Sequence, residues 1–439
     1  MPVTLCGRST TLRIATLLLL AGTAAACSSS EDGSSADPAA ANAPGTTPGG
    51  SSGGTASSPA ATAAPGAVDP ACLTGGYARL PNAVTAVFAR EGGAVVVAGT
   101  RRVEIDGAGK TGVEGTGTSS SQYWDLRLLP NGGLLSLDEN ELTTWDAAGK
   151  ATASALVGKL LVKPSYVAPI EGGFLVAGAE KAAAAQNKRV IALQKLSTTG
   201  EADPTFGDKG IARVVSTDDL RLEGIHVAKS GEVWIRGSGK MYVPFLAKFS
   251  ANGAADAAFG TAGVASLDRL GTRASRDLVF GKDGSVFLLG MTGDAPQIMK
   301  LRADGAPDAT FGQGGLAELR VTKPLSSKYD EQVESKSLLL QEDGKLLVVS
   351  SYEWDDGEDR KLEEESLLVL RLGTDGALDA SFGTEGRVRV ALGAAGTPSK
   401  DWAKPGAAIV GSRLLVGGTT YTELGSKGAQ AGGLVCLAL

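Results

Sequence analysis

A two-residue turn followed by a short apolar strand recurs seven times in this chain of 439 residues. Gly92-Gly93 precedes AVVVAG, for example, and Asp283-Gly284 precedes SVFLLG. Such pairs supply the positive φ angles that two-residue hairpin turns require. The second turn residues, spaced 40 to 68 residues apart, are Gly93, Gly133, Gly173, Gly231, Gly284, Gly344 and Ser412. A repeat of this length therefore organises most of the chain.

A further apolar strand follows each hairpin, and in most units it runs into a turn that ends in glycine. IMKLRADG from Ile298 is one example, and the last unit ends in LVCLAL from Leu434. Blades of four short antiparallel strands have this spacing. We therefore predict an all-β fold, a β-propeller of seven blades, with six or eight as alternatives because the first two units are short.

The third to sixth units also share the pattern G-x-x-D-x-x-F-G-x-x-G, and a strand follows each copy. An aspartate can accept hydrogen bonds from amides just after it, and the glycines permit angles that side chains forbid. A phosphate cradle would instead need a strand that leads into a helix. The motif therefore predicts a structural corner with a buried phenylalanine. Its residues are Asp203, Phe206, Gly207 and Gly210; Asp256, Phe259, Gly260 and Gly263; Asp308, Phe311, Gly312 and Gly315; and Asp379, Phe382, Gly383 and Gly386.

This motif, preceded by an apolar strand and an Asp-Gly or similar turn, resembles the delta-60 repeat of bacterial exported proteins. The four full copies cover about residues 160–392, and the flanking units match only the hairpin part. The resemblance implies a β-propeller. It implies no activity, cofactor or site residue, so it leaves the function open.

Residues 1–26 are typical of a secretory signal peptide, with two arginines, no acidic residue and an apolar run that ends in small residues. Cys27 directly follows these small residues, an arrangement that resembles the bacterial lipobox and implies a lipid-modified N-terminus. Ser28 is not the aspartate of an inner-membrane retention signal, so we expect the outer membrane or the cell surface. The alternative is simple secretion with a free Cys27 thiol.

Residues 27–71 consist almost wholly of Ser, Gly, Ala, Pro and Thr. Such a segment buries too little apolar area to offset the entropy of ordering. We predict a disordered tether here and a propeller over residues 72–439.

The charge limits the partners that this chain can have. The formal charge is −6, and it becomes −8 once the two arginines of the leader are removed. An acidic surface argues against nucleic acid and anionic lipid as ligands. We expect a monomer that contacts the membrane only through its lipid anchor and binds an unknown envelope protein or surface glycan.

Of the four cysteines, Cys6 lies in the leader and Cys27 would carry the lipid. The remaining two, Cys72 and Cys436, are best explained as a disulfide in an exported protein. GYARL from Gly76 resembles the strand after the motif, so it can supply the strand that the last unit lacks. The pair would then fasten the closing blade.

Catalytic residue types are scarce in this sequence. His226 is the single histidine, within the strand-like GIHVA, and no metal-ligand spacing or G-x-S-x-G elbow occurs. We therefore expect no enzyme, metal or cofactor, and predict a non-catalytic binding or scaffolding module. The alternative is a hydrolase or lyase of extracellular polymers, because acids from different blades can meet at a central channel. A spacer without a specific ligand is the third possibility.

Two insertions lengthen the units. YEWDDGEDRKLEEES, residues 352–366, contains eight acids and lacks the order of a calcium loop. We interpret it as a solvated loop, with cation or partner binding as the alternative. KAAAAQNKR, residues 181–189, has the same place in the third unit and lengthens a loop.

Overall fold

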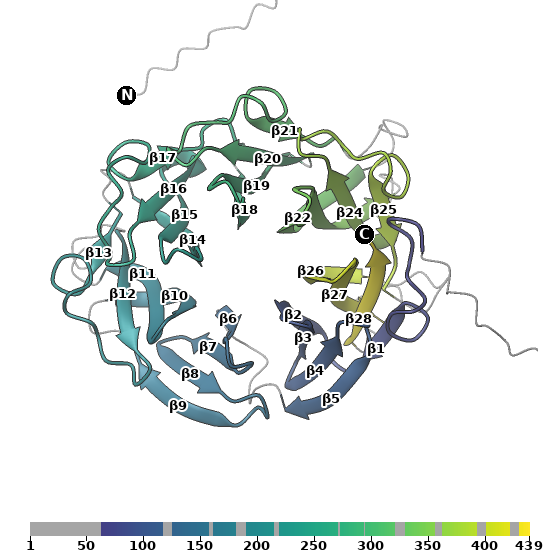
Figure 1. The fold of residues 1–439 in the computed structure, drawn as a ribbon, viewed down its shortest axis with the longest axis horizontal. Helices are drawn as coiled ribbons and strands as arrows, with labels where there is room; N and C mark the ends of the chain where they lie inside the picture. The colour runs from purple at the N-terminus through teal and green to yellow at the C-terminus, as the bar shows by residue number, and fades with distance from the viewer. Residues whose placement is uncertain are drawn as a thin grey trace, which may run out of the picture. The chain divides into compact units, whose positions relative to one another are not determined.

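The computed structural model describes residues 63–116, 125–157, 161–180, 190–214, 219–270, 273–293, 295–320, 330–355, 362–392, 401–421 and 430–439. The strands of these residues form seven antiparallel sheets of four strands each. The predicted β-propeller of seven blades is therefore confirmed. Figure 1 shows the blades arranged in a ring. The predicted leader, Cys27 and most of the predicted tether lie outside the described residues.

Six blades follow the chain from their inner to their outer strand. Blade 1 contains β2 (Val84–Arg90), β3 (Gly93–Ala98), β4 (Arg101–Asp106) and β5 (Thr111–Thr116); blade 2 contains β6 (Asp125–Leu128), β7 (Leu134–Asp138), β8 (Glu141–Trp145) and β9 (Ala151–Leu156); blade 3 contains β10 (Leu161–Ile170), β11 (Gly173–Glu180), β12 (Ile191–Ser197) and β13 (Ala212–Arg213).

The next three blades have the same order. Blade 4 contains β14 (Arg221–Val227), β15 (Val233–Ser238), β16 (Pro244–Phe249) and β17 (Val264–Ser266); blade 5 contains β18 (Arg273–Phe280), β19 (Val286–Thr292), β20 (Ala295–Leu301) and β21 (Leu316–Glu318); blade 6 contains β22 (Asp330–Leu340), β23 (Leu346–Asp355), β24 (Leu362–Leu372) and β25 (Arg387–Val390). A short 3-10 helix, η1 (Lys240–Tyr242), precedes β16, and no helix of the described residues is long and apolar enough to span a membrane.

Blade 7 contains strands from both ends of the chain. From the innermost strand outwards it contains β26 (Asp401–Val410), β27 (Arg413–Tyr421), β28 (Gln430–Ala438) and β1 (Tyr77–Leu80). Purple β1 lies beside yellow β28 in Figure 1, with Tyr77 paired to Val435. The predicted disulfide between Cys72 and Cys436 is present and spans 364 residues of sequence. The ring is thus closed as the sequence predicts.

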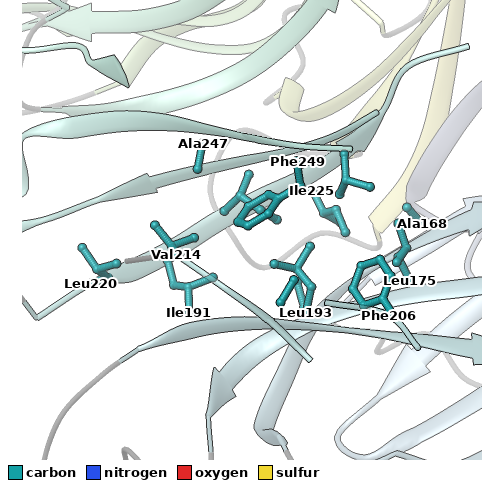
Figure 2. Packing of buried hydrophobic residues seen from close by; sticks show 14 of the residues in the cluster. Ala168, Leu175, Ile191, Leu193, Phe206, Val214, Leu220, Ile225, Ala247 and Phe249 are labelled. Carbon is teal, nitrogen blue, oxygen red and sulfur yellow. The ribbon is translucent and has the colours of Figure 1, made fainter. Parts of the chain in front are cut away.

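The core lies between neighbouring blades rather than in one central mass. Both faces of a middle strand are covered by adjacent blades, so β3 and β15 are buried along their whole length. This explains why these strands are continuous apolar runs rather than alternating patterns. Figure 2 shows one such layer, in which Phe206 lies among aliphatic side chains of blade 3 such as Leu175 and Leu193.

The four motif copies form corners between the third and fourth strands of blades 3 to 6. In the first copy the Asp203 carboxylate accepts the Thr205 amide at 2.9 Å. Gly207 has a φ of 61°, and its N–H donates to the Asn252 carbonyl of blade 4 at 2.8 Å. Phe206 is only 1% exposed. Each corner therefore connects its blade to the next one.

Residues 66–77 form a fifth corner that the sequence analysis missed. Asp69 accepts an amide two residues further on, as Asp203 does. Leu73 has a φ of 56° where Gly207 has 61°. The Leu73 N–H donates to the Gly109 carbonyl of blade 1 at 2.6 Å. Residues 66–71, assigned above to the tether, therefore belong to the propeller, because their backbone bonds fix them to blade 7.

The disulfide occupies the centre of this fifth corner. Cys72 stands at the position that Phe206 has in blade 3. The Asp69 amide donates to the Cys436 carbonyl in blade 7, as the Asp203 amide donates to the Lys195 carbonyl in blade 3, each at 2.9 Å. A Cβ on Gly109 would lie 2.4 Å from the Cys72 sulfur. A covalent bond thus replaces the buried ring of the other corners.

Candidate functional site

Charged and polar side chains gather on the inner strands, which lie nearest the middle of the ring in Figure 1. Several of these strands contain a β-bulge, for example β14 between Leu222 and Gly224 and β18 between Arg273 and Asp277. A bulge adds a residue without a ladder partner and redirects a side chain. The polar set is Asp125, Arg127, Tyr166, Glu223, His226, Arg276 and Asp277, with Arg236 from β15.

Two acids of this set hold neighbouring blades together. Asp277 of blade 5 accepts the Leu278 amide at 2.8 Å and the Leu338 amide of blade 6 at 2.9 Å. Asp125 of blade 2 accepts the Val167 amide of blade 3 at 2.9 Å in the same way. Burial raises the pKa of both carboxyls. Their oxygens are therefore engaged by the scaffold.

Arg127 strengthens the contact between blades 2 and 3. Its guanidinium forms an ion pair with Asp125 at 3.1 Å and donates from Nε to the Val167 carbonyl at 3.1 Å. A further ion pair joins blades 5 and 6, between Arg276 and Glu334 at 3.2 Å. The inner strands are thus connected by charges as well as by apolar packing.

His226 and Arg236 are paired in blade 4. Arg236 Nε donates to His226 Nε2 at 2.9 Å, so the histidine is an acceptor there and carries its proton on Nδ1. Burial and the charge of Arg236 lower the pKa of His226 well below its usual value. A Cβ on Gly224 would lie 2.4 Å from the guanidinium. Glycine at this bulge therefore makes room for the arginine.

Glu223 differs from Asp125 and Asp277 because one of its carboxylate oxygens accepts no hydrogen bond from the described residues. Its Oε1 accepts the Ser238 hydroxyl at 2.6 Å, whereas its buried Oε2 has no hydrogen-bond partner among the described residues. Burial raises the pKa of this carboxyl, and burial likewise raises the pKa of the Tyr166 phenol. Glu223 is therefore a buried acid that keeps one oxygen without a donor among the described residues.

The structure places the sixteen predicted motif residues at the corners and away from the inner strands. Each motif aspartate forms an ion pair with a cation of its own blade: Lys195–Asp203 at 3.2 Å, Lys248–Asp256 at 2.9 Å, Lys300–Asp308 at 2.8 Å and Arg371–Asp379 at 2.9 Å. Hydrogen bonds from Lys300 and Thr310 hold the pKa of Asp308 well below its usual range. A strand rather than a helix follows each corner, which is the arrangement of a scaffold element.

Sequence reasoning named His226 but missed Glu223 and Arg236. A signal was present, because Arg236 interrupts the apolar strand VWIRGS, and a buried arginine requires polar partners. Which partners it finds depends on bulges in another strand, and these have no clear pattern in the sequence.

The two insertions lie partly or wholly outside the described residues. Tyr352–Asp355 extend β23 and Leu362–Ser366 extend β24, whereas residues 356–361 and 181–189 are outside. Within the described part of the chain, no group of three His, Cys, Asp or Glu side chains is arranged to hold a metal ion.

Residues 341–382 match the model of a family described as a domain of unknown function (DUF5122) beta-propeller. No curated protein matches the chain. Among solved structures, a catalytically inactive virginiamycin B lyase from Staphylococcus aureus with quinupristin is 8% identical, with a TM-score of 0.47, over 82% of this chain and 98% of its own. A protein from Lactobacillus plantarum is 15% identical, with a TM-score of 0.43, over 80% and 94%. Likenesses this distant carry no argument about function.

Proposed function

We propose that this chain is an exported, lipid-anchored β-propeller that acts as a non-catalytic binding or scaffolding module in a bacterial envelope or at the cell surface. Lipid on Cys27 would anchor it, and the Ser- and Gly-rich segment would hold the propeller away from the headgroups. Its partner would be an envelope protein or a surface glycan.

The use of the inner-strand acids carries this proposal. Asp125 and Asp277 accept backbone amides of the following blades, so these carboxylates stabilise the ring. Glycoside hydrolysis needs two carboxyl groups that face one substrate. Acids that are occupied by the scaffold cannot serve in that way, and this favours binding over catalysis.

The partner can be tested by chemical crosslinking in intact cells followed by mass spectrometry. We expect one envelope protein or glycan to be enriched with the full-length chain. A Cys27→Ser variant serves as the control, since loss of the lipid should release the chain from the membrane fraction. Recovery of only abundant, unrelated proteins would argue against a dedicated binding role.

Glu223 favours a second candidate function, a hydrolase or lyase of extracellular polymers. Its raised pKa and its unpartnered Oε2 suit a general acid or base, and His226 lies in the same blade. Assays on a panel of bacterial polysaccharides would test it with the wild type and Glu223→Gln. Turnover that the variant loses would assign an enzyme, whereas no turnover on any substrate would favour the binding module.

A further inference from the structure

The junction between blades 2 and 3 lacks a corner. In blade 3, Ala202 bridges to β12, Ala212 pairs with Leu193, and residues 203–211 between them form the corner. In blade 2, Ala151 and Ala155 occupy the matching ladder positions on β8, and only residues 152–154 lie between them. The next strand therefore follows directly, and no phenylalanine is inserted toward blade 3.

A cavity of about 480 Å³ lies at this junction. It is lined by Thr152 and Ala153, which replace the corner, and by Trp145 of the same blade. Across the junction it reaches Phe174 and Thr198 of blade 3. The volume lies within the range of ligand-binding clefts. We name this cavity the blade 2–3 groove.

The preceding junction, between blades 1 and 2, also lacks a corner but is filled in another way. Arg102 is 1% exposed and donates to the Gly132 carbonyl of blade 2 at 2.6 Å. It also forms an ion pair with Glu104 at 2.9 Å. In blade 2 the ladder position of Arg102 is taken by Leu142, and no lysine or arginine of the described residues lines the blade 2–3 groove. Its Thr144 stands where blade 3 has Lys195.

The corners at other junctions show which groups pack between two neighbouring blades. At the junctions that have a corner, the corner buries its central side chain and donates an amide to the following blade. For Phe259 the ring is 0% exposed, and the Gly260 N–H bonds to the Asp304 carbonyl at 3.0 Å. The groove is continuous with the interface between blades 2 and 3, which supplies Phe174 and Leu135 to one cluster. A turn that carries an aromatic residue followed by glycine is the matching occupant.

The charge of the groove limits which residue can precede the aromatic residue of a bound turn. Among the described residues, Asp146 is the one charged residue that lines it. The corner aspartates elsewhere pair with lysine or arginine, and Thr144 cannot provide that partner. A peptide with an acid before its aromatic residue is therefore disfavoured, and one with a basic residue there is favoured.

We propose that the blade 2–3 groove binds an aromatic–glycine turn of a partner protein, with a basic residue on its N-terminal side, as a corner supplied in trans. This inference rests on the proposed binding function and specifies its site.

Labelled peptides and the full-length chain can test the groove by fluorescence anisotropy. The probe is the chain's own segment 201–211 with Asp203→Lys. We expect saturable binding, at least tenfold weaker binding with Asp203 restored, and a similar loss with Phe206→Ala in the peptide. In the protein, Ala153→Phe fills the groove and should abolish binding. Ser154→Phe, the exposed neighbour that does not line the groove, should leave binding intact.

Three results with the purified protein would overturn the groove proposal, and one result in cells would do so as well. One is no saturable binding of the lysine peptide at millimolar concentration, and another is binding that Ala153→Phe leaves unchanged. The third is concentration-dependent dimerisation that Ala153→Phe abolishes, which would assign the groove to a second copy of the chain. If a partner crosslinks in cells equally well to the Ala153→Phe variant, the binding function stands and the groove assignment fails.

Discussion

Asp125 and Asp277 show how a single buried acid can join two blades. One carboxylate oxygen of each acid accepts the amide of the next residue in its own strand. The other oxygen accepts a backbone amide of the following blade. Burying a carboxylate is costly unless it is hydrogen-bonded, and these two bonds offset that cost. The acids therefore contribute to the ring rather than to a reaction.

The pH dependence of stability should reveal the raised pKa of Asp277. Its folded pKa lies above the usual value of 3.8, so the folded state binds the proton more tightly than the unfolded chain. This contribution is fully present below pH 3.8 and is lost as the pH rises through the folded pKa. We expect the free energy of unfolding of the wild type to fall relative to Asp277→Asn over that range. Urea denaturation at a series of pH values measures it, and parallel curves would contradict the assignment.

The sequence predicted the motif side chains better than the polar side chains of the inner strands. Asp203 and Phe206 recur in register with three other copies, so their burial and turn chemistry could be inferred. Asp277 shares its role with Asp125, but two such acids form no repeat in the sequence, and Glu223 bonds to Ser238 of its own blade. The amide that Asp277 accepts comes from blade 6, and only the packing of the two blades brings the two groups together.

The corner is the element that repeats between blades, and its aromatic ring is its largest apolar contribution. Phe259 packs edge to face against Trp234 with ring centroids 5.0 Å apart. Gly305 of the next blade lies over the same ring, where a Cβ would be only 2.9 Å from it. The ring thus connects two blades through close packing.

Removal of that ring should be strongly destabilising. For Phe259→Ala we expect a loss of about 3–5 kcal/mol in the free energy of unfolding, from lost burial and the cavity left behind. The matched control is Leu156→Ala, since Leu156 is 82% exposed and its truncation should change stability by less than about 0.5 kcal/mol. Chemical denaturation compares the two variants. Equal effects would show that the corner is not a packing element.

The fifth corner should tolerate conversion to the aromatic form. Cys72→Phe with Cys436→Lys recreates the pair that blade 3 has at Phe206 and Lys195. We expect this double variant to be more stable than Cys72→Ser with Cys436→Ser by about 1–3 kcal/mol, because it regains a buried ring. Thermal denaturation of both variants makes the comparison. A less stable Phe–Lys variant would show that the two corners are not equivalent.

Sequence reasoning found four corners and missed the fifth because it relied on phenylalanine and glycine. In VDPACLTGGYARL the aspartate and Gly76 keep the spacing, but Cys72 and Leu73 replace the two most distinctive positions. Leu73 adopts a positive φ that would not be expected of leucine. The backbone bonds to blades 7 and 1 hold it there, and these bonds exist only in the closed ring.

Within its described residues the propeller has five junctions that contain a corner of the chain, and a cavity of about 910 Å³ lies beside the corner between blades 5 and 6. Blades 1 and 2 lack corners, and the junction between blades 2 and 3 contains an open groove. The number of blades and the closing strand could be predicted, since they follow from repeat spacing. The groove could not, because it is defined by residues that are missing from one unit and by how the next blade packs.

Site-specific photocrosslinking in intact cells tests whether this propeller binds a partner at the blade 2–3 groove. The photoreactive residue would replace Thr152 in the groove or, as the control, Thr205 in the filled corner of blade 3. We expect one dominant partner from the Thr152 position, with the crosslinked peptide containing an aromatic residue followed by glycine. We expect no crosslinked partner from the Thr205 position. The same pattern from both positions, or no product from Thr152, would contradict binding at the groove.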